Sequence, residues 1–139
     1  MIRSIARASP LVVLVIASAV AAGEPSDAAG VQAAEAWLKL VDAGQYGASW
    51  DEAAPMFRER VSRAEWEKMA AAARRPLGKV LSRKLSAKQV AHTLPGAPDG
   101  TYVVLVYETR FEHKEKGSEN VTVMLDPQGR FRAAGYFIR

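Results

Sequence analysis

The 139-residue sequence contains no cysteine and only two histidines. The absence of cysteine excludes a disulfide framework and a thiol nucleophile. His92 and His113 lie in or beside predicted strands, and neither belongs to an H-x-x-x-H motif or has a carboxylate at metal-binding spacing. A G-x-S-x-G motif is also missing, so the sequence offers no serine nucleophile elbow. We therefore predict neither a bound metal nor a cofactor.

Long apolar runs are equally scarce, and the longest lies near the N-terminus. The uncharged stretch over residues 8–23 holds 16 residues, whereas a membrane-spanning helix needs about 20. Arg3 and Arg7 precede its apolar part, and small residues at 19–21 follow it. This order is typical of a cleavable secretory signal rather than of an uncleaved anchor.

We accordingly predict a signal peptide over residues 1–21, a flexible leader over 22–30 and a single domain over 31–139. Cleavage is expected after Ala21, with Ala22 as the next choice. The protein is then periplasmic or secreted, and a lipid-anchored lipoprotein is not expected because no cysteine follows the signal.

A strong excess of charge is missing as well. The formal net charge is +4, and it falls to about +2 when Arg3 and Arg7 leave with the signal peptide. A weakly charged exported protein is a poor candidate for a nucleic-acid partner.

Hydrophobic spacing predicts three helices in the first half of the domain. The first runs over residues 31–43, and the second covers residues 46–54 and ends at Pro55. The third begins at a capping box over residues 62–65 and ends near residue 74. Its inward stripe is expected to contain Trp66, Met69, Ala70 and Ala73.

A turn-rich segment, LPGAPDG at residues 94–100, separates two predicted strands. The strand before it covers residues 79–94, and a slip in its alternation predicts a β-bulge within residues 86–88. The strand after it, residues 101–111, has the strongest strand signal of the sequence. Its odd positions are expected to face the core: Val103, Leu105, Tyr107, Thr109 and Phe111. Its even positions begin with an apolar group that needs a cover: Tyr102, Val104 and Val106.

Two further strands complete the predicted sheet. We expect an exposed hairpin tip at residues 114–119, a strand over 121–125, a type I turn at 126–129 and a last strand over 130–138. Helices followed by an antiparallel meander indicate an α+β domain, with N-terminal helices packed on a curved four-stranded antiparallel sheet.

Five segments resemble a family of small exported bacterial proteins, the domain of unknown function 4019 (DUF4019) family. They are AAEAWLKLVDAGQYGASWDEAA (33–54), FRERVSRAEW (57–66), RRPLGKVLSRKL (74–85), LPGAPDGTYVVLVYETRFEHK (94–114) and ENVTVMLDPQGRFRAAGYFIR (119–139). The element order also resembles the NTF2-like (SnoaL-like, cystatin-like) cone. The resemblance implies a fold and an exported location, and it implies no activity because this architecture hosts many functions.

Acid–base catalysis would need a carboxylate or tyrosine held in an apolar cone. Asp51, beside Trp50, and Tyr107, on the inward strand face, are the candidates for an enzyme of the isomerase or cyclase type. The alternative is a solvated Asp51 and a core Tyr107.

Large aromatic side chains either line a cavity in the cone or fill it. The pocket-lining candidates are Trp37, Trp50, Trp66, Tyr107, Phe111 and Phe137.

Basic residues are concentrated between the third helix and the first strand. They offer a site for an anionic envelope ligand, or else a solvated face that protects an edge strand. The anion-binding candidates are Arg74, Arg75, Lys79, Arg83, Lys84 and Lys88.

These patterns favour an exported envelope protein that acts as a non-catalytic binding or interaction module. The alternatives are the isomerase- or cyclase-type enzyme and a purely structural envelope protein. The expected partners are an envelope protein, an anionic envelope ligand, or a second copy bound through Tyr102, Val104 and Val106.

Overall fold

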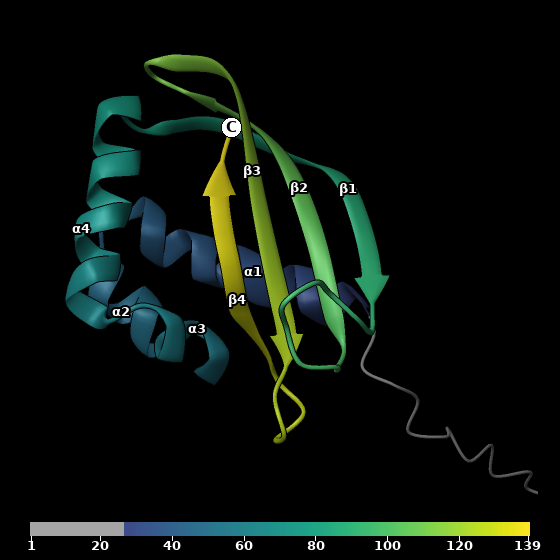
Figure 1. Cartoon of the computed structure of the whole chain (residues 1–139). Helices are drawn as coiled ribbons and strands as arrows, with labels where there is room; N and C mark the ends of the chain where they lie inside the picture. The colour runs from purple at the N-terminus through teal and green to yellow at the C-terminus, as the bar shows by residue number, and fades with distance from the viewer. Residues whose placement is uncertain (1–26) are drawn as a thin grey trace, which may run out of the picture.

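The computed structural model describes residues 27–139, so the predicted signal peptide and residues 22–26 of the leader lie outside the described part. Within residues 27–139, four α-helices and a short 3₁₀ helix precede four strands (Figure 1). The elements are α1 (Asp27–Asp42), α2 (Tyr46–Asp51), α3 (Pro55–Arg60), α4 (Arg63–Arg74), η1 (Arg75–Leu77), β1 (Val80–Ala91), β2 (Tyr102–Phe111), β3 (Lys114–Leu125) and β4 (Phe131–Ile138).

The strands form one antiparallel sheet in the order β1-β2-β3-β4. The sheet is curved, α1 runs across one of its faces, and α2, α3 and α4 gather beside β4 (Figure 1). This arrangement confirms the predicted α+β class. No helix of the described part is long and apolar enough to cross a membrane.

Helix α1 begins at Asp27, four residues before the predicted start, so residues 27–30 are helical and the predicted leader is too long. An ion pair and a close approach to the sheet fix the position of this first turn. The Asp27 carboxylate lies 2.9 Å from the Lys88 ammonium. A Cβ at Gly30 would lie 2.8 Å from Val103 Cγ2, so the glycine lets the helix approach the sheet. The remaining buried residues of α1 follow the predicted stripe: Ala34, Trp37, Leu38 and Val41.

The second helix is shorter than predicted, and Pro55 begins a further helix rather than ending this one. Helix α2 stops at Asp51, and α3 has Pro55 in its first turn, where the fixed φ of proline suits a helix and its missing N–H costs nothing. Phe57 of α3 is buried, whereas the sequence suggested a connector there.

Helix α4 begins as predicted. The Ser62 hydroxyl accepts a hydrogen bond from the Glu65 amide, and the Glu65 side chain accepts one from the Ser62 amide. The inward stripe differs from the prediction, since Met69 is 59% exposed and Ala73 is exposed too. The buried residues recur every four positions instead: Trp66, Ala70 and Arg74.

Strands β1 and β2 pair with a register shift between Leu85 and Ala87, which leaves Ser86 as the extra residue of a β-bulge. This confirms the bulge predicted within residues 86–88. All five odd positions of β2 predicted to face the core are buried. The inward face of β2 is therefore the centre of the core beneath α1.

The hairpin between β2 and β3 is tighter than predicted. Its turn consists of Glu112 and His113, so the expected tip over residues 114–119 belongs to strand β3. Gly117 makes this possible, because a Cβ there would lie 2.8 Å from the Phe111 ring. The charged composition of the segment concealed a strand whose alternate residues are buried.

The loop between β1 and β2, residues 92–101, covers Tyr102. The Tyr102 hydroxyl donates a 2.5 Å hydrogen bond to the Pro98 carbonyl, and its side chain is fully buried. Tyr102 is therefore not part of an exposed sheet face, contrary to expectation. Val104 and Val106 remain half-buried on that face.

An aromatic cluster occupies the space between the helices and the end of the sheet. Around Trp37 lie Phe57, Trp66 and Tyr136, with ring centroids 6.5, 5.9 and 5.4 Å from it. The Trp37 indole donates to the Ser49 carbonyl at 2.8 Å, and the Trp66 indole donates to the Ser49 hydroxyl at 2.9 Å. This part of the core is filled by the chain's own rings.

Candidate functional site

A network of charged side chains, of which Arg74 and Glu119 are buried, joins α1, α4 and the sheet. Asp42, at the end of α1, accepts a 2.8 Å hydrogen bond from Arg74 and two hydrogen bonds of 2.8 and 2.9 Å from Arg83. Arg83 also places its Nε 2.8 Å from Oε1 of Glu119. Burial opposes the ionisation of Asp42, but the two guanidinium groups outweigh it and hold the pKa of Asp42 below its usual range.

Glu119 is the most deeply buried charged residue of this network. It accepts hydrogen bonds from the hydroxyls of Thr109, at 2.5 Å, and Tyr136. Burial, together with the charge of Glu119, raises the pKa of Tyr136. Every oxygen of the Glu119 carboxylate is thus engaged by the chain itself, which indicates a structural role.

The network accounts for two of the anion-binding candidates. Arg74 and Arg83 are paired within the fold, and the Arg74 guanidinium carbon also lies 5.2 Å from the centre of the Phe111 ring. Lys88 is paired with Asp27. The predicted basic cluster is therefore not one anion site. Its exposed members with no ion pair among residues 27–139 are Arg75, Lys79 and Lys84.

The two candidate catalytic residues lie in different surroundings. Asp51 is 52% exposed and accepts hydrogen bonds from Arg63 at 3.1 and 3.2 Å, which keeps the pKa of Asp51 low. Tyr107 is buried between α1 and β1, and burial raises the pKa of its hydroxyl to about 12. The predicted arrangement, in which both groups point into one cone, is wrong because Asp51 faces solvent.

The aromatic candidates are distributed over three environments. Trp37 and Trp66 belong to the filled cluster, and Phe111 is buried under Arg74. Trp50 is half-buried and donates its indole N–H to the Val61 carbonyl at 2.8 Å. Phe137 is 48% exposed, so it does not line the core as expected. It pairs with Asn120 on β3, which places it on the outer face of the sheet.

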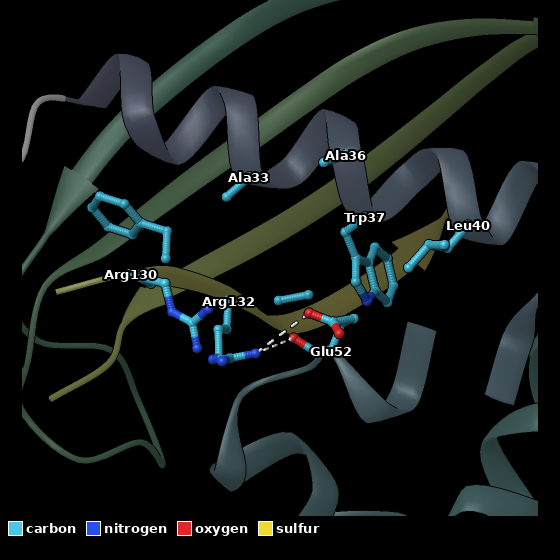
Figure 2. A pocket seen from close by; sticks show the side chains of 9 residues that line it. Ala33, Ala36, Trp37, Leu40, Glu52, Arg130 and Arg132 are labelled. Atoms are coloured by element: carbon cyan, nitrogen blue, oxygen red, sulfur yellow. Dashed lines mark hydrogen bonds and ion pairs between the residues drawn. The ribbon is translucent and has the colours of Figure 1, made fainter. Parts of the chain in front are cut away.

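An apolar groove does exist, between α1 and the edge strand β4. We call it the α1–β4 groove, and its volume is about 400 Å³. Figure 2 shows α1 as one wall and β4 as the other, with Trp37 and Leu40 reaching down from the helix. The residues that line it are Ala33, Ala36, Trp37, Leu40, Glu52, Arg130, Phe131, Arg132 and Ala133.

The rim of this groove carries charge, but most of that charge is paired. The Arg132 Nε lies 2.8 Å from Oδ2 of the buried Asp126, and its Nη1 lies 3.6 Å from Oε2 of Glu52, as the dashed lines to Glu52 in Figure 2 indicate. Arg130 is different, because its side chain is 67% exposed and its nearest carboxylate, that of Asp126, is 3.9 Å away. Arg130 is the cation of the rim that is most available to a ligand.

The local sequence explains this geometry. Asp126 opens the turn before β4 and accepts hydrogen bonds from the amides of Gln128 and Arg130, each at 2.9 Å. Gly129 completes the turn with a φ of +81°, where glycine is favoured. The turn therefore fixes the start of β4 and places Arg130 and Arg132 beside the groove.

Sequence reasoning identified Trp37 as a lining residue and missed the rest of the groove. Apolar residues at 33, 36 and 40 on α1 follow helical spacing and form a second apolar stripe, so the sequence pattern could have indicated this wall. Glu119 was missed as well, although it shares the parity of Val121 and Val123 on β3, both of which are buried. That parity is the signal that could have found it.

The family model described as a protein of unknown function (DUF4019) matches residues 33–136. The chain therefore belongs to the DUF4019 family. No curated protein matches the chain. The finer resemblance to the NTF2-like cone stays a prediction.

Proposed function

We propose that this member of the DUF4019 family is an exported, non-catalytic binding module that takes an apolar ligand with one anionic group into the α1–β4 groove. The observation that carries the proposal is the groove's composition. Alanine, leucine and aromatic side chains form its walls, and the exposed Arg130 stands at its rim. Concave apolar sites with a few polar groups are the usual form of small-ligand sites.

The apolar walls and Arg130 contribute different amounts to the free energy of ligand binding. Each buried CH₂ group of a ligand contributes roughly 0.8 kcal/mol, so a chain of several carbons supplies most of the affinity. An exposed ion pair contributes about 0.2–1 kcal/mol. Arg130 therefore selects an anionic end over a neutral one by about fivefold at most.

The alternatives have less support. Catalysis of the isomerase or cyclase type was expected to use Asp51, and Asp51 is held by Arg63 at the surface. A purely structural envelope protein would have no use for an accessible apolar groove. Export rests on the N-terminal signal pattern, with its basic start, apolar centre and small residues before Ala22.

The proposal is tested by titrating the protein with decanoate and with decanol in a calorimeter. We expect both to bind, with decanoate preferred several-fold. Arg130→Gln should abolish the preference while leaving decanol binding intact, and the matched control Arg110→Gln, on the outer sheet face, should preserve the preference. Absence of binding by both probes would favour the structural alternative, and a preference that survives Arg130→Gln would remove Arg130 from the site.

A further inference from the structure

On the opposite flank of α1, we propose a second ligand site, between α1 and the strands β1 and β2, that takes a small zwitterion of amino-acid size. A cavity of about 380 Å³ lies there. The residues that line it are Glu35, Lys39, Asp42, Arg83, Leu85 and Tyr107. This site goes beyond the proposed function, because none of its lining residues belongs to the α1–β4 groove.

Tyr107 is the deepest residue of this cavity, with 1% of its surface exposed. Its hydroxyl has no hydrogen-bond partner among the described residues. Buried hydroxyl groups are nearly always bonded, and leaving one without a partner lowers stability. A hydroxyl held in this state at the bottom of a cavity is a ready donor or acceptor for a polar ligand.

The mouth of the cavity carries one available charge of each sign. Glu35 and Lys39 stand four residues apart on α1, so both face the same flank of the helix. Both are exposed, and neither has an ion pair within residues 27–139. Asp42 and Arg83, the other charged residues of the cavity, neutralise each other through two hydrogen bonds.

This distribution of charge specifies the ligand class. An ammonium group would meet Glu35, a carboxylate would meet Lys39, and a polar group farther along the ligand would reach the Tyr107 hydroxyl. A simple anion would leave Glu35 opposed to it, and a simple cation would be repelled by Lys39. Leu85 supplies an apolar wall for the ligand's carbon chain.

The test is a titration of the ¹⁵N-labelled full-length chain with L-serine, L-glutamine and L-tyrosine, three zwitterions of increasing size. We expect at least one of them to shift the amide signals of Lys39, Leu85 and Tyr107 at millimolar concentration. Tyr107→Phe removes only the hydroxyl and breaks no hydrogen bond of the described structure, so the variant should fold. It should weaken binding at least fivefold. Glu35→Gln and Lys39→Met, which remove exposed charges, should each weaken binding by up to about fivefold.

Lys84→Met, an exposed lysine of β1 outside the cavity, is the matched control and should leave binding unchanged. Ala36→Trp, which fills the α1–β4 groove, should also leave amino-acid binding unchanged. The two proposed sites can therefore be tested independently. The proposal is overturned if none of the three amino acids shifts these signals. It is equally overturned if Tyr107→Phe binds as tightly as the unmodified chain, since the hydroxyl would then hold only water.

Discussion

The Nε atom of Arg83 on β1 lies 2.8 Å from Oε1 of Glu119 on β3, and the Glu119 side chain is fully buried. The two strands are not neighbours in the sheet, so the pair spans β2 on its inward face. A buried ion pair adds little net stability over an apolar pair of the same shape, because both charges lose their hydration. Its larger effect appears when one partner is removed.

Glu119→Leu should lower the free energy of unfolding by about 3–5 kcal/mol, because the partly buried Arg83 loses a partner and the hydroxyls of Thr109 and Tyr136 lose their acceptor. Urea unfolding followed by circular dichroism measures the change. Glu115→Leu, an exposed position on the same strand, should change it by less than about 0.5 kcal/mol. The double variant Arg83→Met/Glu119→Leu should lose less than the sum of the two single changes, and full additivity would contradict the pairing.

The lowered pKa of Asp42 predicts a dependence of stability on pH. The folded pKa lies below the unfolded value of about 3.9, so Asp42 contributes stability above that value and loses the contribution as pH falls through the folded pKa. Unfolding midpoints at pH 7 and pH 2.5 should show Asp42→Asn to be less stable than the unmodified chain at pH 7. The difference in unfolding midpoint between the two chains should be smaller at pH 2.5 than at pH 7. An equal difference at both pH values would show that the charge of the Asp42 carboxylate does not stabilise the network.

The sequence predicted most of the fold because its local signals are strong. The capping box at Ser62, the bulge near Ser86 and the alternation of β2 each have a direct physical cause in neighbouring residues. Pro55 was misread because proline both ends helices and begins them, and only the burial of Phe57 decides between the two. The charged stretch after His113 was misread because its strand character depends on pairing with β2.

The candidate sites were harder to predict, since they depend on which distant residues meet. Arg74 and Arg83 are charged residues that a sequence pattern assigns to the surface, and only the parity of β3 marks Glu119 as inward. Which carboxylate each arginine meets follows from the three-dimensional arrangement alone. Asp42 brings two of them together from the end of α1. The α1–β4 groove likewise forms between segments about 90 residues apart.

The proposed export predicts where the mature N-terminus lies. When the full sequence is produced with its N-terminal segment in a Gram-negative host, the periplasmic fraction should contain a chain beginning at Ala22, because cleavage after Ala21 follows the small residues of the signal. Intact-mass spectrometry measures the cleavage site directly. Replacing Leu14 by arginine interrupts the apolar run and should leave the uncleaved chain in the cytoplasm. An unmodified chain that keeps Met1 and stays cytoplasmic would contradict export.

The most direct test of the proposed function is to fill the α1–β4 groove and measure binding of decanoate by calorimetry. Ala36→Trp places an indole inside the groove, whereas Ala72→Trp places the same side chain on the exposed surface of α4. We predict that decanoate binds to the unmodified chain and to Ala72→Trp with the same affinity, and that Ala36→Trp weakens binding at least tenfold. Equal binding by all three chains, or no binding to the unmodified chain, would contradict the groove as the ligand site.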